Sequence, residues 1–167
     1  TAMYIMSTLG DIDRADYAIF ADPGAELPDT YMLWDDLNKW RENNNGIPLI
    51  KKTKSLYKNI IEGLNSYGAR WASIPAFSEK GGMIRRQCTG EYKVDVVMKE
   101  IRKLQNLRKY QKMSPTEVWL GISLDEIQRM KLSRVHRVTY KYPLIDKKIT
   151  RSECKDYLEK NGFLNVK

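Results

Sequence analysis

The chain has 167 residues and a formal net charge of +8, from 29 Lys and Arg against 21 Asp and Glu. This length predicts a single domain, residues 1–167, that buries about 70% of the surface exposed by its unfolded chain. No run approaches the ~20 apolar residues of a membrane span, and no secretory signal precedes the first polar segment, so neither a membrane nor a secreted protein is expected. The two cysteines lie far apart without a pairing pattern, which excludes a disulfide framework and favours a cytoplasmic location.

Helix and strand signals alternate along the first half of the chain. Apolar residues recur at helical spacing at the start, the run 17–21 is apolar, and Pro28 is a favoured first residue of a helix. The predicted elements are a helix over 1–9, a strand over 17–21, a helix over 28–42, a strand over 47–50, and a helix over 56–64 closed by Gly68. Because the chain opens inside a periodic apolar pattern, we expect residues to be missing before Thr1.

The second half begins with a loop from 69 to 90, which is long enough to be either functional or disordered. After it we predict a helix over 94–104, a strand over 116–123, a short helix carrying Arg129, a strand over 138–142, and a helix from Thr150 to Gly162. Ser114-Pro-Thr-Glu117 also fits a capped helix start, but the apolar run that follows favours the strand. Ser123-Leu-Asp-Glu126 and Thr150-Arg-Ser-Glu153 share the capping-box spacing and are predicted to cap the helices they open. This alternation predicts βα units.

Charge is unevenly distributed along the sequence. Acidic residues outnumber basic ones up to Gly46, whereas basic residues dominate from Lys80 onward. Such asymmetry indicates an anionic partner, either a polyphosphate nucleotide or a nucleic acid. A solvated surface without a partner is the alternative for the lysines on helices.

Three loops carry polar residues that could form a site. The first, Asp22-Pro-Gly24, directly follows the strand over 17–21. In an open α/β sheet, ligands bind at the carboxyl ends of strands. An ordinary turn is the alternative, because Asp, Pro and Gly are standard turn residues.

The second loop carries Arg85, Arg86 and Cys88 before a helix that contains Lys93. Helix N-termini and arginines both bind phosphate or sulfate oxygens. The same surroundings would lower the pKa of the cysteine and favour its thiolate. A buried, inert cysteine is the alternative.

The third loop runs from Gly121 through Ser123, Asp125 and Glu126 to Arg129. A glycine at a strand end allows a ligand to approach the backbone closely. Asp125 and Glu126 are candidate acid–base groups or metal ligands, and a capping role is the alternative for Glu126. The only histidine lies in a basic stretch, so a structural zinc site and a Ser-His-Asp triad have no support.

Taken in order, these segments resemble the sulfonucleotide (PAPS) reductase family of the PP-loop, or adenine nucleotide alpha-hydrolase-like, enzymes. The matching segments are Asp22-Pro-Gly24 with Pro28 and Thr30, Cys88 through Lys93-Val94, Gly121 through Arg129, and Tyr142-Pro-Leu-Ile-Asp146. Their order and approximate spacing agree, so the resemblance covers nearly the whole chain. Arg85-Arg86-Gln-Cys88-Thr and Gly121-Ile-Ser-Leu-Asp-Glu are most similar to members from phages and mobile elements and from DNA sulfur modification.

The resemblance implies a Rossmann-like three-layer sandwich with a mainly parallel sheet that binds an adenine nucleotide, PAPS or ATP, at its carboxyl edge. It implies an enzyme of sulfur metabolism. An oxidoreductase would use a C-terminal cysteine to attack the sulfonate of PAPS. In a transferase, a substrate oxygen would attack the α-phosphate of ATP, and the adenylated intermediate would then accept sulfur from a donor protein.

The resemblance also assigns roles to residues. We expect the nucleoside to be flanked by Asp22, Gly24, Gly121 and Ser123, with Asp125, Glu126 and Arg129 beside it, and anionic oxygens to be held by Arg85, Arg86 and Lys93. Cys88 is expected to be a redox residue or a ligand of an iron–sulfur cluster, and Mg²⁺ would accompany ATP.

Parts of the family pattern are not found in this sequence. The Ser-Gly-Gly-x-x-Ser PP-loop and its strand would precede Thr1, and the cysteine-containing tail would follow Lys167, so we expect both ends to be incomplete. Asp22-Pro replaces the usual Asp-Thr and removes a hydroxyl. The alternative function is a catalytically inactive nucleotide-sensing or nucleic-acid-binding module on the same fold.

Overall fold

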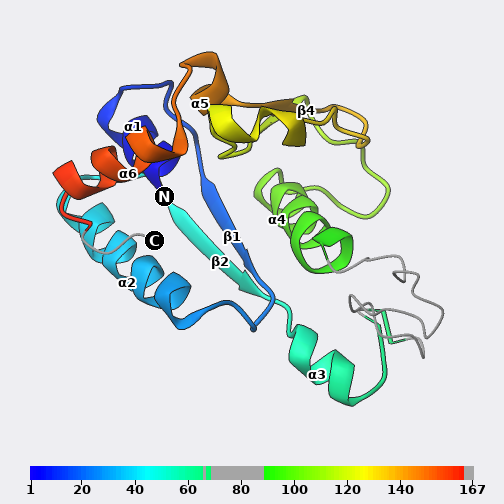
Figure 1. Ribbon diagram of the computed structural model, residues 1–167. Helices are drawn as coiled ribbons and strands as arrows, with labels where there is room; N and C mark the ends of the chain where they lie inside the picture. The colour runs from blue at the N-terminus through cyan, green and yellow to red at the C-terminus, as the bar shows by residue number, and fades with distance from the viewer. Residues whose placement is uncertain (66, 69–88, 164–167) are drawn as a thin grey trace. The chain divides into compact units, whose positions relative to one another are not determined.

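The computed structural model describes residues 1–65, 67–68 and 89–163, in which helices and short strands alternate (Figure 1). In chain order the elements are α1 (Ala2–Leu9), β1 (Ala18–Asp22), α2 (Pro28–Asn43), β2 (Leu49–Thr53), α3 (Leu56–Ile61), η1 (Gly90–Val94), α4 (Asp95–Leu104), β3 (Thr116–Trp119), η2 (Leu124–Arg129), β4 (Val138–Lys141), α5 (Pro143–Asp146) and α6 (Arg151–Lys160). The element η1 is a π-helix and η2 is a 3-10 helix. This mixture is compatible with the predicted α/β class. Within the described ranges, no helix combines the length and the apolar character that crossing a membrane requires.

Most predicted elements are confirmed, with shifted ends. The prediction that Gly68 closes the third helix is wrong, because α3 already ends at Ile61 and Gly63 adopts a left-handed φ of 64°. A residue in this conformation turns the chain out of the helical path. β2 begins at Leu49, two residues later than predicted. The helix predicted from residue 94 is preceded by the π-helical turn η1, and positions 69–88 of the predicted loop lie outside the described residues.

The strands pair in parallel, as expected for βα units. β1 pairs with β2 across the connection through α2, and the Lys54 N–H donates to the Asp22 carbonyl at 2.9 Å. β3 pairs with β4 in a register from Thr116 opposite Val138 to Trp119 opposite Lys141. The residues that the structure describes thus form two short parallel sheets of two strands each. The strand assignment for β3 confirms the preference over a capped helix at this position.

The chain divides into two compact units. The first unit comprises residues 1–18, 31–48 and the chain from 108 onward, and the second comprises residues 19–30 and 49–107. The first unit therefore holds β3, β4 and the helices α1, α5 and α6. The second unit holds most of β1, together with β2, α3 and α4.

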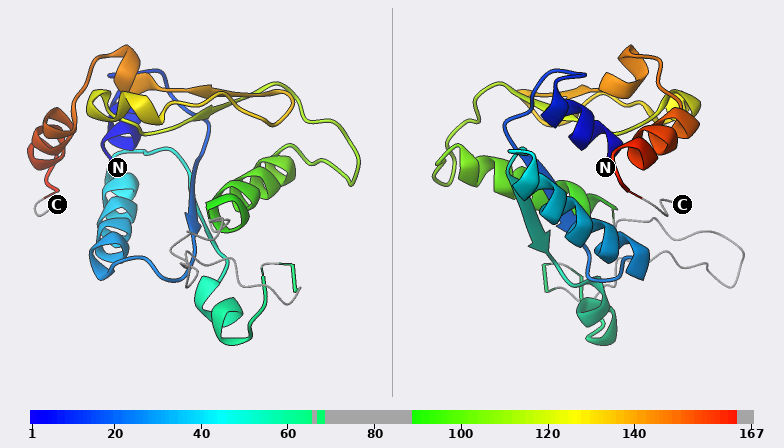
Figure 2. Two further views of the ribbon diagram at one scale, coloured as in Figure 1. Left: turned by 45° about the vertical axis from the view of Figure 1, so that its right-hand side comes forward. Right: turned by 90° about the vertical axis from the view of Figure 1, so that its left-hand side faces the viewer.

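The core of the first unit brings together residues from its N-terminal and C-terminal segments. Met6 of α1, Ile12 and Leu144 of α5 form a buried apolar cluster, against which the partly buried side chains of Met3, Trp119, Ile149, Cys154 and Tyr157 pack. The right-hand view of Figure 2 shows α1 beside α6, with which it is in contact. This packing positions α1 and α6 next to the end of β3.

Candidate functional site

The carboxyl edge of the β3–β4 pair is built by three segments of the first unit. The chain leaves β3 through Gly121 and Ser123, and it leaves β4 directly into α5. The Leu124 N–H donates to the Ile149 carbonyl at 2.8 Å, and the Arg151 N–H donates to the Asp125 carboxylate at 2.5 Å. These bonds fasten the segment after β3 to the start of α6.

A pocket of about 240 Å³ opens at this edge. Gly121, Ser123 and Glu126, three residues predicted for the site, lie around it. The other lining residues come from the start of α1, from α5 and from α6: Thr1, Ala2, Met3, Leu144, Arg151, Cys154, Lys155 and Leu158. The structure thus brings part of the third predicted loop together with residues at least 18 positions away in sequence.

The position of Gly121 bears on how that pocket is shaped. A Cβ atom added there would lie 3.8 Å from the Met3 Cε atom, which is an ordinary contact. The Gly121 φ is not in the left-handed region either. Neither packing nor backbone conformation therefore demands a glycine here.

The charged groups of the pocket favour an anion. Arg151 and Lys155 contribute two cationic side chains from α6. The carboxylate of Glu126 is paired with Arg129, with 2.5 Å between the nitrogen and the oxygen. The first turn of α1 also reaches the lining, and the N–H groups of a helix's first turn have no acceptor within the helix. A phosphate or sulfate group matches this combination.

Asp125 and Arg129 have contacts of their own beside the pocket. Asp125 accepts the Arg151 N–H, and Arg129 pairs with Glu126. The prediction that Ser123 caps η2 is wrong, because its side chain makes no capping hydrogen bond. Ser123 is nevertheless buried. The predicted capping box of α6 is confirmed, with Thr150 and Glu153 bonded reciprocally. The bonds from Thr150 lower the pKa of Glu153.

Sequence reasoning missed the four pocket residues that α6 supplies, which are Arg151, Cys154, Lys155 and Leu158. Arg151, Cys154 and Lys155 stand at spacings of three and four residues, which places them on one helical face. The capping box at Thr150 marked where this helix starts, so the shared face was readable from the sequence. What the sequence did not show is that this face turns toward Gly121.

Cys154 gives a prediction that depends on pH. Burial raises the pKa of its thiol, and the carboxylates of Glu153 and Asp125 act in the same direction. We therefore expect the rate of alkylation by iodoacetamide to rise with a midpoint above about 8.5, the ordinary cysteine value. Mass spectrometry of a Cys88→Ser variant reads Cys154 alone, since the chain has two cysteines.

The same variant unfolded in urea is the control, and its midpoint should return to about 8.5. A folded-state midpoint at or below that value would contradict the prediction that burial raises the pKa of this thiol.

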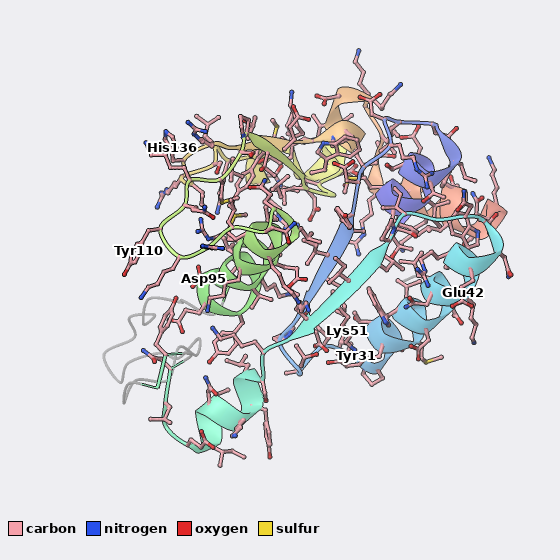
Figure 3. The ribbon with its side chains drawn as sticks, turned by 180° about the vertical axis from the view of Figure 1, so that it is seen from behind. Tyr31, Glu42, Lys51, Asp95, Tyr110 and His136 are labelled. Atoms are coloured by element: carbon pink, nitrogen blue, oxygen red, sulfur yellow. The ribbon has the colours of Figure 1, made fainter. Side chains whose placement is uncertain are left out.

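The first predicted loop, Asp22-Pro-Gly24, lies in the second unit and forms a hydrogen-bonded turn. The buried Asp22 carboxylate accepts the Gly24 N–H at 2.7 Å and the Thr53 hydroxyl at 3.2 Å, and it pairs with the Lys51 ammonium at 3.3 Å. Figure 3 labels Lys51 on β2. Gly24 has a left-handed φ of 70°, which favours glycine. These contacts give Asp22 and Gly24 a structural role at the end of β1.

Lys93 was predicted to hold anionic oxygens. Its ammonium pairs with the Glu26 carboxylate at 2.8 Å within the second unit. The nearby Lys54 ammonium donates to the Glu91 carbonyl at 3.1 Å and lies 5.2 and 5.4 Å from the centroids of the Tyr67 and Tyr92 rings. Burial, and then the charge of Lys99, lower the pKa of Lys54.

Three predicted residues, Arg85, Arg86 and Cys88, lie outside the described residues. Over the described ranges, no group of three or more His, Cys, Asp or Glu side chains is placed to hold a metal ion. Those ranges contain one cysteine, Cys154, which does not fit an iron–sulfur cluster that needs several cysteine ligands. The carboxylates of Asp125 and Glu126, which Mg²⁺ would use, already bond to Arg151 and Arg129.

Comparisons with known proteins add no assignment. No family model matches the sequence, and neither a curated protein nor a solved structure matches it. The candidate site is therefore argued from its own residues.

Proposed function

We propose that this protein is an enzyme of the PAPS reductase type, which binds an adenine nucleotide at the carboxyl edge of β3 and β4. The nucleotide is PAPS or ATP, and the reaction is sulfonucleotide reduction or ATP-dependent sulfur transfer. The fold we propose for it is a Rossmann-like three-layer sandwich. The parallel pairing of β3 with β4 and the connection from β1 through α2 to β2 support this fold.

The observation that carries the proposal is the pocket beside Gly121 and Ser123, with Arg151 and Lys155 in its lining. Ligands of open α/β sheets bind outside the carboxyl ends of strands, which is where Gly121 and Ser123 stand. The two cationic side chains suit phosphate or sulfonate oxygens. The volume of about 240 Å³ lies below the ~300–1,000 Å³ of pockets that enclose a whole small ligand. We therefore assign the phosphate end of the nucleotide to it.

In this proposal the residues of the pocket bind and orient the anionic group. Arg151 offers a planar fork of donors, and Lys155 adds a compact charge from the same helical face. Asp125 accepts the Arg151 N–H and so holds the first turn of α6, which positions the Arg151 side chain. No step is assigned to an iron–sulfur cluster, because the described cysteine does not fit one.

Calorimetric titration with ATP, PAPS and adenosine tests the proposal. We expect one of the two nucleotides to bind and adenosine to bind far more weakly, because it lacks the anionic group. An Arg151→Ala, Lys155→Ala double variant should lose about 3 kcal/mol of binding free energy, or a hundredfold in affinity, because two charge-assisted bonds are removed. Release of sulfite from PAPS, or of pyrophosphate from ATP, then identifies the reaction.

The matched control is a Lys147→Ala, Lys160→Ala variant, which removes the same charge at exposed positions that do not line the pocket. Equal affinity of the two double variants would contradict the assignment of the pocket. Absence of binding by both ATP and PAPS would overturn the proposed function itself.

A further inference from the structure

The opposite edge of the β3–β4 pair carries a different surface. The loops that precede β3 and β4 meet there, because parallel strands begin at the same edge. The Thr116 N–H donates to the Arg137 carbonyl at 2.9 Å, and the Arg137 guanidinium donates to the Met113 carbonyl at 3.3 Å. Both loops belong to the first unit, and these bonds hold them side by side.

These two loops are strongly basic. No acidic residue occurs between Glu100 and Glu117, or between Glu126 and Asp146. Five exposed cationic residues of the loops make up what we call the basic face: Arg108, Lys109, Lys112, Arg134 and Arg137. In the part of the chain that the structure describes, Lys109, Lys112 and Arg134 form no salt bridge. The charge of this surface is therefore not neutralised by neighbouring carboxylates.

An exposed aromatic ring accompanies these charges. Tyr110 is 87% exposed, and the Lys109 ammonium lies 5.0 Å from the centroid of its ring. A φ of 69° holds this residue in the left-handed region, which is uncommon for a tyrosine. Figure 3 shows Tyr110 and His136 on the same side of the molecule. An outward tyrosine among lysines and arginines offers a surface on which an unpaired base stacks while its phosphates meet the cations.

We infer that the basic face binds single-stranded nucleic acid. The phosphates contact the cations of both loops, and a base stacks on Tyr110. The charge complementarity selects a polyanion, and the exposed ring selects a strand with unpaired bases over a duplex. This site is separate from the proposed nucleotide pocket, which lies at the other edge of the same strands.

Fluorescence anisotropy with labelled oligo(dT) and oligo(U) of about 20 nucleotides, and with a duplex of the same length, tests the inference. We expect both single strands to bind more tightly than the duplex. Binding should weaken with salt at a logarithmic slope of at most about −3.5, since each single-strand phosphate contact contributes about −0.7. A Lys109→Ala, Lys112→Ala, Arg134→Ala variant should lose at least about tenfold in affinity, and its slope should be shallower by about 2.

The control variant, Lys39→Ala, Lys147→Ala, Lys160→Ala, removes the same charge at exposed positions away from the two loops. It should keep most of the affinity. Tyr110→Ala should weaken single-strand binding several-fold and leave the salt slope unchanged, because it removes stacking and no charge. Equal losses in the two triple variants, no binding of either oligonucleotide, or preference for the duplex would each overturn the inference. ATP binding is expected to be unaffected by all these variants, so the two proposals fail separately.

Discussion

Replacing Leu144 with alanine is expected to lower the free energy of unfolding by about 2–5 kcal/mol. Leu144 is 3% exposed and belongs to the buried cluster with Met6 and Ile12. The substitution removes three buried carbon atoms and leaves a cavity. This cavity adjoins the pocket, because Leu144 is one of the residues that line the pocket. Urea denaturation followed by circular dichroism measures the change.

Leu132→Ala is the matched control for this variant, because Leu132 is 92% exposed. The same atoms are deleted there without a buried contact, so we expect a change within about 0.5 kcal/mol. A similar loss at both positions would mean that Leu144 does not sit in a packed core. Because Leu144 also lines the pocket, nucleotide affinity should be measured under conditions in which the variant is still folded.

Replacing Asp22 with alanine is expected to cost about 1–3 kcal/mol of unfolding free energy. The buried carboxylate accepts hydrogen bonds from the Gly24 N–H and the Thr53 hydroxyl, and its deletion leaves both donors without this acceptor. The pair with Lys51 adds to the loss, discounted because a third of that lysine side chain is exposed. Asp22→Asn keeps an acceptor oxygen and should cost less.

Asp36→Ala serves as the control, because Asp36 is exposed and its pair with Lys39 spans 3.7 Å on the surface of α2. We expect a change within about 0.5 kcal/mol there. The Asp22 variants also separate the two roles considered for that residue. If Asp22 acted only on a nucleotide, Asp22→Ala would weaken nucleotide binding and leave stability unchanged.

Local signals in the sequence predicted much of the fold. The capping box at Thr150 fixed the start of α6, and the apolar run after Pro115 identified β3 against a competing helix signal. An error arose where two glycines close in sequence could each end the same helix. Gly63 ended α3 before Gly68 did, since either glycine adopts the left-handed conformation and the earlier one in the chain takes effect.

The site was predictable only in part, because a pocket is a property of packing. Gly121 and Ser123 could be named because a strand end followed by small residues is a local pattern. Arg151 and Lys155 could not be assigned to the same pocket, because the sequence does not say against which element α6 packs. The sequence left Glu126 as either a chemical group of the site or a helix cap. In the structure it instead forms a salt bridge with Arg129, which neither prediction included.

The capping of α6 has a consequence for how an anion is recognised beside it. The positive end of this helix already faces two carboxylates of the protein, because Glu153 bonds to the Thr150 N–H and Asp125 to the Arg151 N–H. The helix dipole is thus neutralised internally and adds little attraction for a bound ligand. In the proposed site, what α6 itself offers an anion is therefore the flexible side chains of Arg151 and Lys155, and not its backbone N–H groups. Selectivity there rests on the reach and number of those side chains, and exchanging arginine for lysine at 151 should change which anion is preferred.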